Sequence, residues 1–306
     1  MGMRDRTPTS PEEFDGYKTR FSNWGRWGAD DQLGTLNHIT PEVRRAAIQS
    51  VQHGRSVSCS NPIPTVEVQP NLMRNAHPAE HPMRPIPPGY VDALNIWFHG
   101  MVDTHIDATS HYFPDGLMYN GRPGSLVNDA GAASNSVDSW RDGIITRGVL
   151  YDIARMRGQA HIQWGEGVQG WDLEDFAKQH GITPRAGDAV LIRSGSDPFW
   201  ATNPDITDVH NTPGVAPSAL EFLHDTGASL LAWDLTEDAG PTDTTFPHPV
   251  HRIALVYMGM PLVDASNFER LGEACAELGR YEFLYTIAPL VLVGGTGSPV
   301  NPIATL

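Results

Sequence analysis

The segment from Trp97 to Phe113 groups side chains that can bind a metal ion or transfer protons. It reads WFHGMVDTHIDATSHYF. In an extended chain, successive side chains point to opposite faces, so alternate residues share one face. The imidazole and carboxylate side chains of this segment then all lie on one face: His99, Asp103, His105, Asp107 and His111. Because buried charges are costly unless they are paired or bound to metal, this grouping favours a chemical role over packing.

His105 and Asp107 have the spacing of two metal ligands on one strand. Their side chains would stand roughly 6.6 Å apart along the strand, close enough to bind one ion. His111 lies near enough in the sequence to reach the same cavity. Mixed nitrogen and oxygen donors suit Zn²⁺, Mn²⁺ or Fe²⁺ better than Ca²⁺. The alternative is a solvated edge strand with polar residues facing water, but the spacing favours a divalent metal ion.

These side chains need a scaffold, and the rest of the chain alternates predicted helices and strands. Strands separated by helical segments indicate an α/β or mixed α+β fold. Since no linker divides the sequence, residues 1–306 are expected to form a single domain. The expected strands are 147–153, 188–192, 229–233 and 282–293, and the expected helices are 41–53, 172–181, 217–227, 249–257 and 267–278.

A proline-rich segment interrupts this pattern between residues 61 and 90. It contains eight prolines, too many for a regular helix or a central strand. Long loops inside compact domains are often lids or binding loops. We therefore expect a loop or lid over 61–90.

The composition limits the classes of partner. The 306 residues include 36 Asp and Glu but only 21 Lys and Arg, a formal charge of −15. Such an acidic chain is poorly suited to nucleic acid or an anionic membrane surface, which leaves a small molecule as the expected partner. The sequence has two isolated cysteines, no apolar leader and no run of eighteen apolar residues. These features predict a cytoplasmic protein.

The motif Thr104-His105-Ile106-Asp107-Ala108, followed by His111, resembles the THxDxxxH signature of the cyclase-like metal-dependent hydrolases. This family includes bacterial kynurenine formamidase and isatin hydrolase. Further blocks resemble its longer branch of roughly 300 residues: 23–37, 143–152, 187–195, 212–214 and 294–302. The resemblance implies a swivelling β/α/β fold, a homodimer or homotetramer, and metal-dependent hydrolysis of an amide C–N bond.

The resemblance also implies roles for individual residues. His105 and Asp107 would be metal ligands, and His111 would be the acid/base residue. The family places a third ligand, a histidine, four positions before His105, where this chain has Met101. A thioether binds borderline ions poorly. Asp103 and His99 are the candidates to take its place.

A second block that resembles the family lies between residues 247 and 264. His251 matches a site histidine, which we expect to be catalytic, although His248 competes for this role. Asp264 matches an acidic position at which the family normally has Glu, and it is a further candidate metal ligand. Asp234 is a candidate for orienting one of the histidines.

Three functions are compatible with these residues. The leading hypothesis is a hydrolase that uses metal-activated water, with Zn or Mn as cofactor, on a small cyclic or aryl amide, formamide or lactone. The resemblance supplies this substrate range. The alternatives are a metal-independent cyclase or dehydratase that uses His111 and Asp103 for acid–base chemistry, which Met101 favours, and a catalytically inactive small-molecule binding protein.

Overall fold

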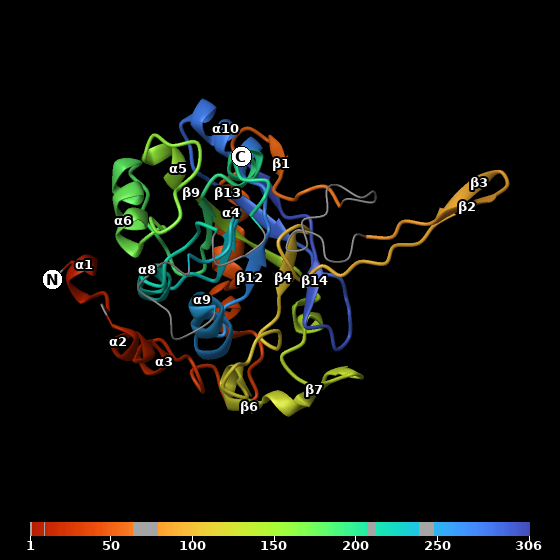
Figure 1. Cartoon of the computed structure of the whole chain (residues 1–306), viewed down its shortest axis with the longest axis horizontal. Coiled ribbons are helices and arrows are strands. Elements are labelled where there is room, and N and C mark those ends of the chain that lie inside the picture. The colour runs from red at the N-terminus through yellow and green to blue at the C-terminus, as the bar shows by residue number, and fades with distance from the viewer. Residues whose placement is uncertain (1, 9, 64–78, 207–211, 239–247) are drawn as a thin grey trace.

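A sheet of nine strands runs through the molecule and carries the segment predicted to be chemically active (Figure 1). The computed structural model describes residues 2–8, 10–63, 79–206, 212–238 and 248–306. Strands from both ends of the chain meet in this one sheet. In sheet order the strands are β1 (Ser56–Ser58), β15 (Ile303–Thr305), β13 (Glu282–Ile287), β9 (Ile144–Asp152), β10 (Ala189–Arg193), β11 (Leu230–Trp233), β12 (Leu262–Asp264), β4 (His105–Asp107) and β14 (Gly297–Pro299).

The centre of the sheet is parallel, because β9, β10, β11 and β12 follow one another with helical segments between them. Every residue of β10 and β11 is buried, as expected for strands covered on both faces. These strands confirm the predicted segments 188–192 and 229–233 to within one residue, and β9 starts three residues before the predicted 147–153. The α/β, mixed α+β prediction is confirmed.

The predicted helices are all present, with shifted ends. Thr40 caps α4 (Pro41–Gln49), which ends four residues before the predicted end. The remaining predicted helices correspond to α6 (Gly170–Gln179), α8 (Ala219–Thr226), α9 (Pro249–His251) and α10 (Glu269–Leu278). The short α9 continues as a π-helix, η6 (Arg252–Met258), a rare form that is frequent at functional sites.

Several elements were not predicted, and most are short. The helices are α1 (Met3–Arg6), α2 (Pro11–Asp15), α3 (Tyr17–Arg20), α5 (Ile153–Met156) and α7 (Ser196–Thr202). The small strands are β5 (Leu117–Met118), β6 (Arg122–Pro123), β7 (Val127–Asn128) and β8 (Gly131–Ala132). The 3₁₀ turns are η1 (Gly34–His38), η2 (Tyr119–Gly121), η3 (Gly124–Leu126) and η4 (Val137–Trp140). Among the described residues, no helix is long and apolar enough to cross a membrane.

Two sequence predictions need correction. The strand predicted over 282–293 ends at Ile287, and the apolar residues that follow Pro289 form an exposed loop instead of a core strand. The segment 61–90 is not irregular throughout, because β2 (Met83–Ile86) and β3 (Gly89–Asp92) form a separate hairpin. This hairpin projects from the body (Figure 1). Residues 64–78 of the predicted lid lie outside the described residues.

Candidate metal centre

The register between β4 and its neighbour β12 brings the predicted site residues together. His105 and Asp107 lie on one face of β4, as their spacing predicted, because they are two residues apart in a strand. His105 pairs directly with Asp264 on β12, so the Asp264 side chain lies on the same face. A residue 157 positions further along the chain (264 − 107 = 157) thus reaches Asp107 through strand pairing.

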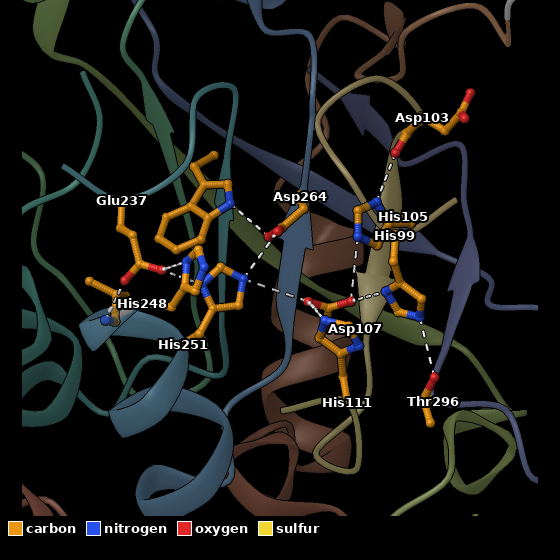
Figure 2. A network of polar contacts seen from close by, with 12 residues as sticks. His99, Asp103, His105, Asp107, His111, Glu237, His248, His251, Asp264 and Thr296 are labelled. Carbon is orange, nitrogen blue, oxygen red and sulfur yellow. Dashed lines mark hydrogen bonds and ion pairs between the residues drawn. The ribbon is translucent and has the colours of Figure 1, made fainter. Parts of the chain in front are cut away.

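The predicted alternation is wrong outside this short strand. Residues 97–104 do not form a strand, and the chain turns immediately after β4, where the His111 amide donates to the Ala108 carbonyl. His99 and His111 therefore reach the site from loops on either side of β4, as Figure 2 shows. Their rings stack with centroids 4.0 Å apart.

Asp107 lies at the centre of this group (Figure 2). Its Oδ1 is 3.0 Å from His99 Nδ1 and 3.4 Å from His105 Nε2. Its Oδ2 is 3.8 Å from both His111 Nε2 and His251 Nε2. Asp107 is 1 % exposed, yet among the described residues no donor is aligned to make a hydrogen bond to either oxygen.

This arrangement fits a cation. A buried carboxylate needs partners, and a metal ion among the ring nitrogens would supply one where hydrogen bonds do not. Among the described residues, three groups of ligand atoms lie within 4.8 Å of one another, and two of these groups share Asp107. The first set is His99, His105 and Asp107, and the second is Asp107, His251 and Asp264. The third group, Glu237, His248 and His251, does not contain Asp107. Imidazole and carboxylate donors together suit Zn²⁺ or Mn²⁺.

His99, and not Met101, belongs to the first set. Met101 packs on the apolar cluster of Phe199, Trp200 and Leu235. The ring of His99 lies against Gly297 of β14, where an added Cβ would come within 2.7 Å of the ring. The glycine therefore leaves the space that His99 needs to reach Asp107.

Asp103 lies outside both sets. Its carboxylate points away from the cluster in Figure 2, and burial raises its pKa. Its backbone carbonyl contributes, since it lies 2.8 Å from His105 Nδ1, where it can accept the ring proton. That bond leaves Nε2 of His105 facing Asp107.

A residue that the sequence analysis missed, Glu237, holds His251. Nδ1 of His251 and Nδ1 of His248 lie 2.6 Å and 3.0 Å from the same oxygen, Oε1 of Glu237. The other oxygen accepts the backbone N–H of Val250, in the first turn of α9. No spacing marks Glu237 in the sequence, because it precedes His251 by fourteen residues (251 − 237 = 14) and comes after a strand.

The two competing histidines therefore have different positions. Nε2 of His251 lies 3.2 Å from Asp264 Oδ2, inside the site, whereas His248 contacts Glu237 on the outer side (Figure 2). The indole N–H of Trp233 donates to the second oxygen of Asp264 at 2.6 Å. Asp234 orients no histidine through a hydrogen bond recorded in the described residues. It accepts backbone N–H groups from Ser194 to Ser196.

The pKa values of Asp107, His105 and His111 are shifted in opposite directions by burial and by one another's charges. Burial raises the pKa of Asp107, but the charges of His111 and His105 outweigh it and hold this pKa well below its usual range. Burial lowers the pKa of His105, but the Asp107 carboxylate outweighs it and raises the pKa to about 9. For His111, burial dominates and lowers the pKa to about 4. Opposite shifts in neighbouring groups are typical of functional sites.

Known proteins share this fold. A solved structure described as a novel cyclase is 28% identical, with 94% of this chain and 99% of that chain covered and a TM-score of 0.81. Isatin hydrolase A from Labrenzia aggregata, bound to benzyl benzoate, is 18% identical, with 82% and 93% covered and a TM-score of 0.57. Isatin hydrolase A from Ralstonia solanacearum is 20% identical, with 87% and 97% covered and a TM-score of 0.55. No curated protein matches the chain.

The cyclase-like fold expected from the sequence motifs is thus confirmed. The family model described as "Putative cyclase" matches residues 38–237, which is 200 of the 306 residues (237 − 38 + 1 = 200). This stretch contains the motif around His105 and Asp107 as well as Glu237. The chain belongs to the cyclase family.

Proposed function

We propose that the protein is a metal-dependent hydrolase that acts on a small cyclic or aryl amide, an aryl formamide or a lactone. The observation that carries this proposal is the state of Asp107. Its two oxygens are buried, face four ring nitrogens and accept no hydrogen bond recorded in the described residues. Ring nitrogens are the groups that face this carboxylate, and imidazole and carboxylate donors that converge in this way can bind one divalent ion.

His99, His105 and Asp107 would hold the ion, and His251 and Asp264 offer a second position beside it. Zn²⁺ or Mn²⁺ are the ions that this donor set suits best. When bound, a divalent ion of this kind supplies Lewis acidity, which activates water and polarises a carbonyl group.

The histidines at the rim would carry the protons. His111 is 28 % exposed at its side chain, so it can meet a substrate while its ring nitrogen stays beside Asp107. We assign it the acid/base role, in which it accepts a proton from water and delivers it to the leaving nitrogen or oxygen. His251 is held from behind by Glu237 and completes the polar wall of the site.

The substrate class has support from the neighbours. Two of them are isatin hydrolases, and isatin is a cyclic amide fused to an aromatic ring. The metal-independent alternative was favoured by Met101, but His99 takes the place beside Asp107 that Met101 leaves empty. The hydrolase is therefore the function that the geometry supports best.

A metal measurement combined with a substrate screen tests the proposal. The wild-type protein and the variants His105→Ala, His99→Ala and Met101→Ala would be purified and their metal content measured. We expect the two histidine variants to lose metal and Met101→Ala to keep it, because Met101 packs away from the ligands. Isatin, aryl formamides and aryl lactones would then be offered to the metal-loaded protein.

His111→Ala provides the complementary result. We expect this variant to keep its metal and lose turnover by about 10²- to 10⁴-fold, the usual contribution of a positioned acid/base group. Near wild-type turnover in His111→Ala would refute the role assigned to His111. A wild-type protein that neither retains nor rebinds a divalent metal would refute the hydrolase proposal itself.

A further inference from the structure

A cavity of about 360 Å³ lies against the N-terminal helices, within the range of roughly 300–1,000 Å³ that is usual for small-molecule sites. Its walls come from α1 and α2, from the start of α6, and from the residues that lead into α8. Figure 1 shows these four helices on one side of the molecule and β4 and β14 on the other. The cavity is therefore separate from the metal centre.

The cavity has apolar walls that suit a flat ring. Trp171 is only partly buried, so its ring is open to the cavity, and Phe14 lies in the opposite wall, on α2. Aromatic side chains pack well against other rings, stacked with an offset or edge to face. The apolar lining residues are Pro8, Pro11, Phe14, Trp171, Ala216 and Pro217.

Uncharged polar groups in the wall are engaged within the protein. The Ser218 hydroxyl donates to Gln169 at 2.7 Å, and the Tyr17 hydroxyl donates to Glu221. The hydroxyl of Thr7 donates to a backbone carbonyl at 2.9 Å. These groups hold the walls together, and a ligand would gain little by competing for them.

Among the described residues that line the cavity, only Arg4 carries a charge. Its Cζ lies 5.1 Å from the centroid of the Trp171 ring, and its guanidinium forms no ion pair or hydrogen bond with the described residues. The neighbouring Arg6 is different, since it lies 3.1 Å from Glu221 and 2.7 Å from Asp225. In a chain with a net charge of −15, an arginine that no carboxylate pairs with, beside an uncharged cavity, favours an anionic ligand.

We propose that this cavity binds an aryl carboxylate, with its ring against Trp171 and Phe14 and its carboxylate on the guanidinium of Arg4. A guanidinium presents parallel N–H groups that match the two oxygens of a carboxylate. The contact with the Trp171 ring holds this group beside the apolar walls. The proposal is independent of the hydrolase proposal, because none of the lining residues belongs to the metal centre.

Calorimetric titration of the purified protein tests the proposal, with 2-naphthoate as the charged probe and 2-naphthamide as the uncharged probe of similar shape. We expect 2-naphthoate to bind. Arg4→Gln should weaken this binding by about 10-fold and leave the binding of 2-naphthamide unchanged, because only the carboxylate needs the guanidinium. Trp171→Ala should weaken the binding of both probes, since it removes the ring surface. Arg45→Gln is the matched control, because Arg45 pairs with Glu42 on α4, and it should leave both affinities unchanged.

A metal ion also binds carboxylates, so His105→Ala separates the two sites. We expect this variant to lose metal and still to bind 2-naphthoate like the wild-type protein. Binding that is lost in His105→Ala but kept in Arg4→Gln would place the probe at the metal centre and overturn the proposal. Equal affinity in the wild-type protein and Arg4→Gln, or no binding up to the solubility limit of the probe, would overturn it as well.

Alkylation of an introduced cysteine locates the probe directly. Thr7 lines the cavity and is partly exposed, so Thr7→Cys should react with N-ethylmaleimide, and saturating 2-naphthoate should slow this reaction. Ile48→Cys, at a position 51 % exposed on α4, should react at the same rate with and without the probe. Cys59 and Cys275 are buried and stay out of this reaction. A rate for Thr7→Cys that the probe does not change would contradict binding in this cavity.

Discussion

Replacing Glu237 with Gln tests whether the orientation of His251 sets the activity of the site. In the structure, Oε1 of Glu237 lies 2.6 Å from His251 Nδ1, and this bond keeps Nε2 turned toward Asp107 and Asp264. A carboxylate behind a site histidine fixes its ring and raises its basicity. Gln keeps the shape of the side chain but removes the charge.

The expected loss can be worked out from this bond. A hydrogen bond to a charged group contributes about 1.5–3 kcal/mol, and every 1.4 kcal/mol corresponds to a factor of ten. Glu237→Gln should therefore lower kcat/KM by roughly 10- to 100-fold, which is also the usual cost of losing such a partner. The same variant should retain metal more weakly, as measured by competition with a chelator, a readout that needs no substrate.

His248→Ala is the matched control. His248 contacts the same oxygen at 3.0 Å, but its side chain is 36 % exposed and lies on the outer side. Partly exposed pairs of this kind contribute about 0.2–1 kcal/mol, so kcat/KM of His248→Ala should fall by at most about 5-fold. Wild-type kcat/KM and metal retention in Glu237→Gln would refute the role assigned to Glu237. Equal losses in both variants would show that the effect is not transmitted through His251.

Three further outcomes follow from other parts of the structure. In Gly297→Ala the new Cβ would lie 2.7 Å from the His99 ring and 2.7 Å from the backbone carbonyl of Ile106. The variant should therefore displace His99, strain the pairing of β14 with β4 and bind metal more weakly; unchanged metal affinity would contradict the contact with His99. Removing metal with a chelator should lower the melting temperature, and adding metal back should restore it, because a bound ion would stabilise the buried Asp107 carboxylate. A melting temperature that does not respond would contradict a bound ion. Tyr17→Phe should cost about 1–3 kcal/mol of unfolding free energy at pH 8 in urea titrations, because it leaves the buried Glu221 without the Tyr17 hydroxyl as a donor. Burial and Glu221 raise the pKa of Tyr17, so the contribution of its hydroxyl to the unfolding free energy is complete below pH 10 and declines above it. Between pH 9 and pH 11 the Tyr17→Phe variant should therefore lose less stability than the wild type. Equal losses in the two proteins would contradict the assignment.

The local pattern was enough to find the centre of the site. His105 and Asp107 lie side by side because a strand repeats every two residues, and that repeat is a property of the backbone alone. His99 and His111 reach Asp107 from loops, so their approach depends on a turn after Ala108 and on the space above Gly297. Neither the turn nor the space above Gly297 follows from the two-residue repeat of side chains along a strand.

Long-range contacts were less accessible from the sequence. Asp264 was found through a family resemblance, but its place opposite His105 is set by the pairing of β12 with β4. Glu237 follows β11 as one of several acidic residues, and only the folded chain brings it behind His251. A carboxylate that orients a ligand needs no fixed sequence spacing from it, which is why the pattern did not reveal Glu237.

The misread apolar run at the end of β13 has a physical reason as well. Leu290 to Val293 have strand-forming side chains, but Pro289 cannot donate to a strand ladder. The chain leaves the sheet after Ile287 and exposes these residues. Apolar residues outside the core are ambiguous in the sequence, because a core strand and an exposed contact surface use the same residue types.

The most direct test of the central claim is the metal content of the wild-type protein compared with Asp107→Asn. Asn keeps the size of the side chain and removes the charge that faces the four ring nitrogens. We predict about one equivalent or more of Zn or Mn per wild-type chain, and almost none in a folded Asp107→Asn variant. A metal-free wild-type protein that cannot be reconstituted, or an Asp107→Asn variant that retains its metal, would contradict the account.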